Sequence, residues 1–463
     1  MKKIGFFLLT LTIVFFVGLY LLSQGSDNKI SKFIKDNFSY EIKYLLKKTI
    51  FYVPNLKREY ENLQKEISQL NIDNLKLKNN YDLLFSQLNL GKKSENNIND
   101  LYLINVVAPF TNEKNDYQIK SGYLDIYKNY VFLINGKGNI YYFLKDEFVK
   151  NRIDFKVLNS DINNFISTTT NFRWSGIKDI KIVNDEIFLS ITSEIKKNCY
   201  STSLIKSKIK FDELNFKYVF KNQDCVEIKE GAQPFKFFNG YQTGGRIDNI
   251  DEKLYLTIGD YNAWEYPQVE NKFIGKIIEI NLLSEKIKII SSGHRNPQGL
   301  FIHSFKDKLL ISTEHGPKGG DEINMIDLKL DLKENNYGWP IASYGVHYDV
   351  VPINSFTKKY APLKNSHEKN GFKEPIFTFK EQIGISQIIK NFFSNKNQYF
   401  ITSLRAKKIY LIEFDKNLSK PKIINEYDLK ERIRDIIYDY EYNSYYLLLE
   451  DTPYVSKMFI KKL

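Results

Sequence analysis

The stretch Gly293–Pro340 reads GHRNPQGLFIHSFKDKLLISTEHGPKGGDEINMIDLKLDLKENNYGWP. It contains two polar corners, residues 293–299 and 314–322, on either side of an apolar run at 308–312. Glycine and proline fix unusual backbone paths in such corners, which lets carbonyl and amide groups approach a ligand closely. A single corner of this kind is most simply a turn of an all-β domain. Two of them around one strand, carrying Arg, Asn, His and acids, indicate a binding site, and their carbonyl oxygens suit a hard cation such as calcium.

The motifs of this stretch resemble those of a known family. The runs HRNPQGL (294–300), EHGPKGGDEIN (314–324) and NYGWP (336–340) are together similar to the glucose/sorbosone dehydrogenase family, soluble quinoproteins that use pyrroloquinoline quinone (PQQ) and calcium. The resemblance covers residues 165–463 and is best from 243 onward, whereas residues 101–164 match poorly. It implies a six-bladed β-propeller.

Composition bounds the class of protein. The 463 residues are 43% hydrophobic and 15% aromatic, enough for one large core, and the abundance of Tyr and Phe favours strands after residue 100. The net charge of +12 comes from lysines spread along the whole chain, which is typical of a solvated surface rather than a nucleic-acid footprint. No zinc-finger spacing or phosphate-binding loop is present, so we expect no nucleic-acid partner.

The chain contains two cysteines, Cys199 and Cys225, both in strand-rich sequence. If the domain lies outside the cytoplasm, we expect a disulfide between them. The alternative is a pair of inert buried thiols.

The N-terminus reads as a membrane anchor. Residues 5–22 are apolar without a charge, and Lys2 and Lys3 precede them, which favours an N-terminus in the cytoplasm. We expect residues 1–25 to hold the chain in a bacterial inner membrane by a single pass, with the C-terminal domain in the periplasm. A cleaved signal peptide ending near Gly25 is the alternative. Residues 26–52 would form a juxtamembrane segment.

A heptad pattern predicts a coiled-coil stalk over residues 53–90, followed by a polar linker at 91–100. A second apolar series, offset by three or four residues, accompanies the leucines, and Asn74 within it is a usual register-setting residue of parallel dimers. We therefore expect a homodimer; one amphipathic helix packed on its own domain is the alternative. The leucines recurring every seven residues are Leu56, Leu63, Leu70, Leu77 and Leu84.

Short apolar runs separated by turns make residues 101–463 an all-β domain. No repeat of fixed period is visible, but the evenly distributed strands are too many for one sandwich and favour a β-propeller. The runs expected to be strands are 130–134, 140–144, 187–191, 254–258, 276–280, 286–290, 300–302, 308–312, 398–403, 408–414 and 445–449.

Two pairs of basic residues are candidates for anion binding. Arg432 and Arg434 are two apart, so in a strand both guanidiniums face one side, where planar forks suit carboxylates. A surface strand with ion pairs to Glu431 and Asp435 is the alternative. Arg405 and Lys407 show the same spacing. By resemblance, Arg432 and Arg434 hold the carboxylates of the quinone, and Arg405 replaces a cofactor-binding lysine with its charge kept.

The resemblance also assigns roles within the opening stretch. It implies that Arg295 and Asn296 contact the reacting quinone and the cofactor edge, and that His315 contacts the cofactor. It places active-site calcium on the backbone carbonyls of Gly316 and Pro317. Without the resemblance, His315 reads as a turn histidine satisfied by neighbouring carboxylates.

The sequence departs from the family on the substrate side. The family's general base is a histidine, and here that position is Gln242, in the run QTGGR. Glutamine can orient a hydroxyl but does not titrate near neutral pH, so it cannot accept a proton. All five histidines follow residue 293, and of these His294 or His315 is a hypothetical substitute. A second substrate-side position, usually Gln, corresponds to Trp174.

Two functions follow from these observations. The first is a PQQ-dependent sugar dehydrogenase that oxidises the C1 hydroxyl of an aldose to a lactone, with Arg295 stabilising charge. The second is a non-catalytic propeller that binds a sugar, a glycan or a protein. The enzyme requires Arg295, Arg432 and Arg434 to converge on one pocket, because a scaffold has no need of such a cluster.

Overall fold

The structure is a computed structural model of the chain, and it describes residues 62–70, 73, 93–109, 121–149, 152–167, 175–227, 241–304, 308–419 and 421–460. The chain divides into two units, Met1–Tyr81 and Asp82–Leu463, which are treated separately below.

In the first unit the described residues are helical. Residues 62–70 and Asp73 are each helical, and Asp73 accepts a hydrogen bond from Gln69 at 3.2 Å. Three apolar residues of the expected heptad, Leu63, Ile67 and Leu70, are 55–62% exposed. The expected anchor at 1–25, the segment at 26–52 and most of the stalk lie outside the described residues. None of the helices that are described is long and apolar enough to cross a membrane.

The second unit is built from six antiparallel sheets, apart from the short parallel pairing of β10 with β6. The first sheet contains β3 (Gly122–Tyr127), β4 (Tyr130–Asn135), β5 (Ile140–Leu144), β6 (Lys156–Ser160) and β10 (Glu213–Leu214). The second sheet contains β7 (Gly176–Val183), β8 (Glu186–Lys196), β9 (Cys199–Lys208), β11 (Lys217–Phe220) and β12 (Val226–Glu227). The third sheet contains β13 (Gly244–Ile250), β14 (Lys253–Ile258), β15 (Lys276–Asn281) and β16 (Ile287–Ser292). The fourth contains β17 (Pro297–Ser304), β18 (Leu309–Glu314), β19 (Asp321–Asp327) and β20 (Phe377–Phe379). The fifth contains β21 (Ile385–Lys390), β22 (Gln398–Ser403), β23 (Lys408–Glu413) and β24 (Lys422–Asp428).

The sixth sheet joins both ends of the domain. It contains β1 (Lys93–Ile98) and β2 (Leu101–Val107) from the start and β25 (Ile433–Asp439), β26 (Ser444–Leu449) and β27 (Tyr454–Ile460) from the end, with β2 paired to β27 along its whole length. The strand β1 lies within residues 91–100, the segment expected to be a linker. Short helices complete the domain: η1 (Lys145–Val149), η2 (Ile162–Asn164), α4 (Ser355–Tyr360) and η3 (Glu368–Asn370).

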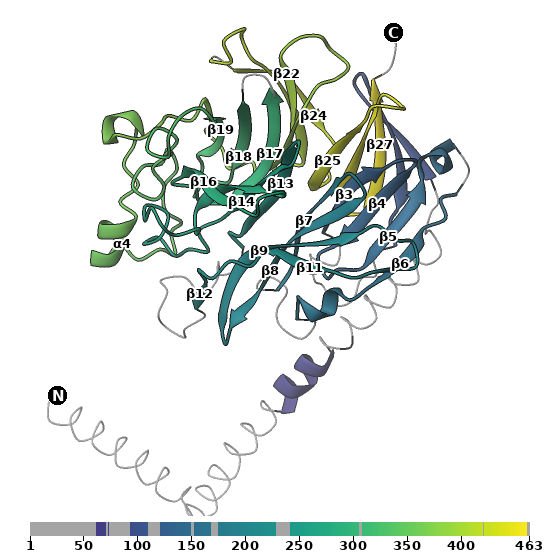
Figure 1. Cartoon of the computed structure of the whole chain (residues 1–463), viewed down its shortest axis with the longest axis horizontal. Helices are drawn as coiled ribbons and strands as arrows, with labels where there is room; N and C mark the ends of the chain where they lie inside the picture. Colours follow the sequence, from purple (N-terminus) through teal and green to yellow (C-terminus); the bar gives the residue numbers. More distant parts are fainter. Residues whose placement is uncertain are drawn as a thin grey trace, which may run out of the picture. The chain divides into compact units, whose positions relative to one another are not determined.

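The six sheets close into a ring around a central channel (Figure 1). The innermost strands β3, β7, β13, β17, β21 and β25 each contact the next, and β25 contacts β3. Six clusters of buried apolar side chains lie between neighbouring sheets; one, for example, packs Phe132 and Ile134 of β4 against Leu189 and Ile191 of β8. The expected all-β six-bladed propeller, including a blade from the poorly matching residues 101–164, is therefore confirmed.

Hydrogen bonds across the channel wall fasten each inner strand to the next. Adjacent inner strands of a propeller do not pair as a sheet, so their channel-facing N–H groups need other partners. Side chains of neighbouring strands supply them at five boundaries, and at the sixth Ser386 donates to the carbonyl of Ile433 at 2.6 Å. The five are Ile182 N to Asp125 at 2.5 Å, Ile247 N to Asp179 at 2.8 Å, Ile302 N to Asp248 at 3.0 Å, Leu300 N to Gln387 at 3.0 Å and Leu124 N to Asp435 at 2.9 Å.

Two local expectations need correction, and one is met. The first polar corner ends earlier than expected, because Pro297, which has no N–H to leave unpaired, already pairs with Glu314 as the start of β17. Arg405 and Lys407 do not share a strand face, because they lie in the turn between β22 and β23, where Lys407 has φ +60°. Cys199 and Cys225 form the expected disulfide.

Candidate functional site

The site lies where the loops preceding the inner strands meet, at one end of the channel. Asn296, just before β17, accepts a hydrogen bond from Gly244 N at the start of β13, at 3.2 Å. Its side-chain oxygen also accepts from Gln298 Nε2 at 3.0 Å, and Gln298 in turn accepts from Arg434 Nη1 of β25 at 3.3 Å. Three blades are thus connected at this level of the channel by side chains.

Arg295 is held in a fixed position by the second corner. Its Nη1 donates to the carbonyls of His315 at 2.9 Å and Gly316 at 2.7 Å, and its backbone N–H donates to Glu314. The guanidinium stacks over the ring of Trp339 at 5.4 Å. The two corners and the NYGWP motif therefore combine to fix a single buried arginine, which is 6% exposed.

Gln242 touches Arg295 directly. With the carboxamide oriented to satisfy both of its ends, Gln242 accepts from Arg295 Nη2 at 2.8 Å and donates to Asp260 Oδ1 at 2.6 Å. Asp260 also accepts from Trp339 Nε1 at 2.7 Å. Burial raises the pKa of Asp260 to about 7, although Arg295 partly opposes this. Gln242, Asp260, Trp339 and Arg295 thus form one closed cluster, with the carboxylate behind the glutamine.

Neither candidate histidine can serve as a proton acceptor in this geometry. His294 is 0% exposed and both of its ring nitrogens are engaged, Nε2 with Ser291 at 2.6 Å and Nδ1 with Glu314 at 2.8 Å. His315 is partly buried near the site. Burial and the charges of Arg295, Arg434 and Arg432 lower its pKa to about 3, so it is neutral and a very weak base at pH 7.

Arg432 and Arg434 converge as predicted, and on a residue that the sequence did not reveal. Their Nε atoms donate to the two carboxylate oxygens of Glu450, at 3.0 and 2.5 Å. Glu450 is 2% exposed; burial alone would raise its pKa, but the two arginines outweigh burial and lower it. The alternative of a surface strand paired to Glu431 and Asp435 does not hold, since Glu431 accepts from Thr452 and Asp435 binds Arg246.

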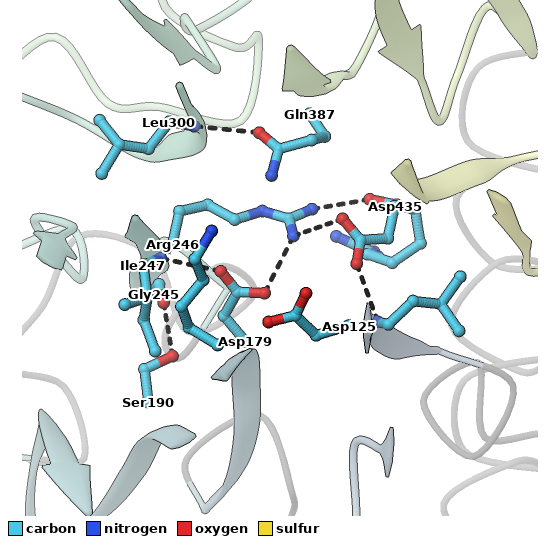
Figure 2. Close-up of polar contacts among 12 residues, drawn as sticks. Asp125, Asp179, Ser190, Gly245, Arg246, Ile247, Leu300, Gln387 and Asp435 are labelled. Atoms are coloured by element: carbon cyan, nitrogen blue, oxygen red, sulfur yellow. Dashed lines mark hydrogen bonds and ion pairs between the residues drawn. The ribbon is translucent and has the colours of Figure 1, made fainter. Parts of the chain in front are cut away.

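Beneath these arginines lies a buried ion cluster, in which Arg246 contacts Asp179 and Asp435 (Figure 2). Arg246, which is 1% exposed, donates to Asp435 at 2.8 Å, to Asp179 at 3.2 Å and to the carbonyls of Gln298 and Arg434, both at 2.7 Å. All three nitrogens of this guanidinium donate within the protein. Arg246 is therefore a structural element of the QTGGR run, and it sets the height of Gln298 and Arg434 above it.

Arg405 stands apart from the cluster. Its side chain is exposed and donates to Gln382 at 2.5 Å. Only its neighbour Leu404 contacts the site, through a carbonyl that accepts from Arg432 at 3.4 Å. The role of Arg405 toward the cofactor stays a prediction.

The two predicted calcium ligands, Gly316 and Pro317, differ in what surrounds them. The Gly316 carbonyl already accepts from Arg295, and the ring of Pro317 packs against Gly345. Within the described residues there is no group of three or more His, Cys, Asp or Glu side chains that could hold a metal. Trp174, the predicted substrate-side residue, lies outside the described residues.

A hollow of about 840 Å³ lies at the other end of the channel. Two of its carboxylates form ion pairs, Asp248 with Lys181 at 2.7 Å and Asp439 with Lys145 at 2.9 Å. The residues that line it include no arginine, so it lacks the guanidiniums that mark the candidate site.

The residues that sequence reasoning missed are Asp260, Gln298, Glu450 and Lys178. Asp260 could have been noticed in the sequence, because it belongs to a Gly-Asp pair that directly follows an apolar strand. Glu450 and Lys178 had none, since their significance depends on partners far away in the chain.

Fold and site together define a class: a six-bladed propeller with a cluster of arginines around one end of its channel. The chain belongs to the glucose/sorbosone dehydrogenase family, whose model matches residues 173–453. This confirms the resemblance seen in the sequence.

Individual relatives agree with that assignment. The aldose sugar dehydrogenase YliI of Escherichia coli (strain K12) is 28% identical over 225 residues, which are 43% of this chain and 55% of the relative, so the chain spans about half the length of this curated relative. The solved apo-form of the soluble aldose sugar dehydrogenase from Escherichia coli matches with a TM-score of 0.57 and 19% identity, over 73% of this chain and 95% of that chain. The PQQ-bound form of an aldose sugar dehydrogenase from Streptomyces coelicolor matches with a TM-score of 0.52 and 16% identity, over 74% and 93%. These structural likenesses show the fold alone.

Proposed function

We propose that this protein binds PQQ at the arginine cluster and oxidises the C1 hydroxyl of a sugar to a lactone. The observation that supports the proposal is that Arg432 and Arg434 share the buried Glu450, while Arg434 also donates to Gln298, which donates to Asn296 beside Arg295. Arg432 and Arg434 carry two positive charges against the one carboxylate of Glu450, so this part of the site has an excess of positive charge.

That excess fits a planar, polyanionic quinone. Arg432 and Arg434 are the residues that would hold its carboxylates, since planar forks match carboxylate geometry. His315 and Asn296 would contact its edge. When bound, the quinone supplies the acceptor for the hydride that leaves C1 of the sugar.

The chain's own residues would orient the sugar and stabilise charge. Arg295 is pre-set by Trp339 and by the carbonyls of His315 and Gly316, so it need not reorganise as negative charge develops beside it. Gln242 would position the hydroxyl by hydrogen bonding. Asp260 lies behind Gln242 and is 0% exposed, so it does not reach the hydroxyl itself.

Calcium is a separate part of the proposal. Binding at the carbonyls of Gly316 and Pro317 would require Arg295 to release the Gly316 carbonyl, which it contacts at 2.7 Å. A calcium ion there would therefore compete with Arg295 for the Gly316 carbonyl.

A second candidate is a non-catalytic propeller that binds a sugar, a glycan or a protein. Gln242 favours it, because loss of a general base costs a factor of about 10² to 10⁴ in rate. The neutral His315 and the enclosed His294 strengthen this argument, since neither replaces the missing base.

We also propose that the propeller is displayed in the periplasm of a bacterium by an N-terminal inner-membrane helix and a dimeric stalk. The apolar run at 5–22 and the exposed Leu63, Ile67 and Leu70 of the described helix support it. Sedimentation of a peptide covering residues 53–90 tests the dimer; a monomer at micromolar concentration would exclude it.

The function is tested by the absorbance spectrum of the full-length protein with PQQ and calcium, before and after adding a panel of aldoses. We expect a bound-quinone spectrum that converts to the reduced form with at least one aldose. Retention of the quinone without reduction would favour the binding protein. Failure to retain the quinone at all would overturn the cofactor proposal.

A further inference from the structure

Lys178 is a buried cation at the level of the arginine cluster. It lies on β7, and a methyl group on Gly245 of β13 would come within 2.3 Å of its Cβ, so the two inner strands touch at this point. Gly245 follows Gly244, whose N–H and carbonyl contact Asn296 and Gln298. Lys178 is therefore adjacent to groups that form the candidate site.

Unlike the other cations of the channel, Lys178 has no carboxylate partner. Arg246 contacts Asp435, Lys181 contacts Asp248 and Lys145 contacts Asp439, each within 2.9 Å. Lys178 makes no hydrogen bond or ion pair to any residue that the structure describes, although it is only 9% exposed.

The charge around Lys178 makes this isolation costly. Burial and the nearby charge of Arg434 lower its pKa to about 7. Arg434 and Arg432 already share one carboxylate, that of Glu450. Lys178 thus adds a further cation beside Arg434, whose carboxylate partner Glu450 is already shared with Arg432.

We propose that Lys178 and Arg434 form a subsite that binds a carboxylate group of the ligand. The carboxylate would lie above the Arg246 cluster and complete the charge balance of the three cations. Two sources carry this chemistry: the quinone cofactor, or a sugar acid as substrate. The subsite rests on the proposed function only for the first source.

The test compares full-length wild type with Lys178→Met and Lys178→Arg. Lys181→Met, on the same strand but at the other end of the channel, is the control. Calorimetry measures the binding of PQQ, of glucuronate and of glucose, without any turnover. Thermal unfolding of each ligand-free variant verifies folding.

We expect Lys178→Met to weaken either PQQ or glucuronate about tenfold to hundredfold, because a charge-assisted hydrogen bond is lost. Lys178→Arg should restore much of the affinity, and the control should bind as wild type. Weaker binding of PQQ alone assigns the subsite to the cofactor, and weaker binding of glucuronate but not glucose assigns it to a sugar acid. Glucuronate binding that depends on Lys178 in a protein that does not bind PQQ would keep the subsite and overturn the proposed function.

The subsite is overturned if folded Lys178→Met binds both carboxylates as wild type does, or if wild type binds neither. It is also overturned if Lys178→Met keeps its affinities and loses only turnover, since that pattern makes Lys178 a proton acceptor.

Discussion

Gln242 occupies a place whose surroundings suit an imidazole better than a carboxamide. Its side-chain nitrogen lies 2.6 Å from Asp260 Oδ1, and Asp260 is held in turn by Trp339. A carboxylate that orients a histidine and stabilises its charged form is a recurring arrangement for proton abstraction. Asp260 therefore lies where it could orient an imidazole at position 242, which here holds a glutamine.

Gln242→His is expected to raise turnover of an aldose by a factor of about 10² to 10⁴ in the PQQ-loaded protein, because the imidazole can accept the hydroxyl proton and rest on Asp260. Steady-state rates with an artificial electron acceptor measure the change, and the pH profile should acquire a new ionisation. Gln242→Asn, which adds no titratable group, is the control. Equal rates in wild type and Gln242→His would contradict the proposed role of this position.

Lys178 makes the stability of the ligand-free protein depend on pH. Its pKa is about 7 in the folded protein and 10.5 when unfolded, so between these values the unfolded chain binds the extra proton. Stability should therefore rise with pH from 7 toward 10.5, by on the order of 1 kcal/mol per pH unit from this group. Denaturant unfolding at pH 7, 8 and 9 should show a smaller slope in Lys178→Met. Identical slopes would show that folding does not lower the pKa of Lys178.

Among the elements, the inner strands carry both the fold and the site. Each is bonded to its neighbour by a side chain, as Leu300 is to Gln387 (Figure 2). The same strands position Gln298, Arg434 and Lys178. Asp435 contributes both to the fold and to the site. One of its oxygens accepts from Leu124 N of the next blade, and the other binds Arg246.

Asp435→Asn is expected to destabilise the propeller by about 3–5 kcal/mol, because Arg246 keeps a single carboxylate partner in a buried place. Chemical denaturation measures the loss. Asp212→Asn, an exposed substitution, should change stability by less than about 0.5 kcal/mol. If Asp435→Asn also lowered the free energy of unfolding by less than about 0.5 kcal/mol, the ion pairs of Arg246 would not contribute to stability.

How far the sequence predicts these elements depends on where their partners lie. Runs such as 140–144 and 398–403 coincide with β5 and β22, because apolar patterning acts locally. The start of β17 was missed since Pro297 and Gly299 read as turn residues. Glu450 and Lys178 could not be recognised, because burial and neighbours from other blades give them their meaning. Arg432 and Arg434 were predicted to converge, and the acid between them was not.

At the scale of the whole propeller, the sixth blade closes the ring, because strands from both ends of the domain form it. Its strands β1 and β2 come from the start of the domain and cover the edge of β27 at its end. An exposed strand edge is open to aggregation, so the ring depends on this pairing.

Removal of residues 1–92 should leave a folded, monomeric propeller, whereas removal of residues 1–107 should give an aggregating or unfolded protein. The first deletion keeps β1 and β2, and the second exposes β27 along its length. Size-exclusion chromatography and thermal unfolding distinguish the two products. A cooperative transition in the shorter protein would show that the three C-terminal strands form a stable blade alone.

Because strands from both ends of the domain form the sixth blade, this blade can be completed only at the end of synthesis. The first two strands leave the ribosome early, but their partner β27 begins only at Tyr454. At the usual rate of about 5–20 residues per second, they wait for tens of seconds with only each other to pair with. A protease pulse during translation should therefore cut residues 93–107 until the last strand emerges. Protection of this segment before β27 is made would show that another part of the chain shelters it.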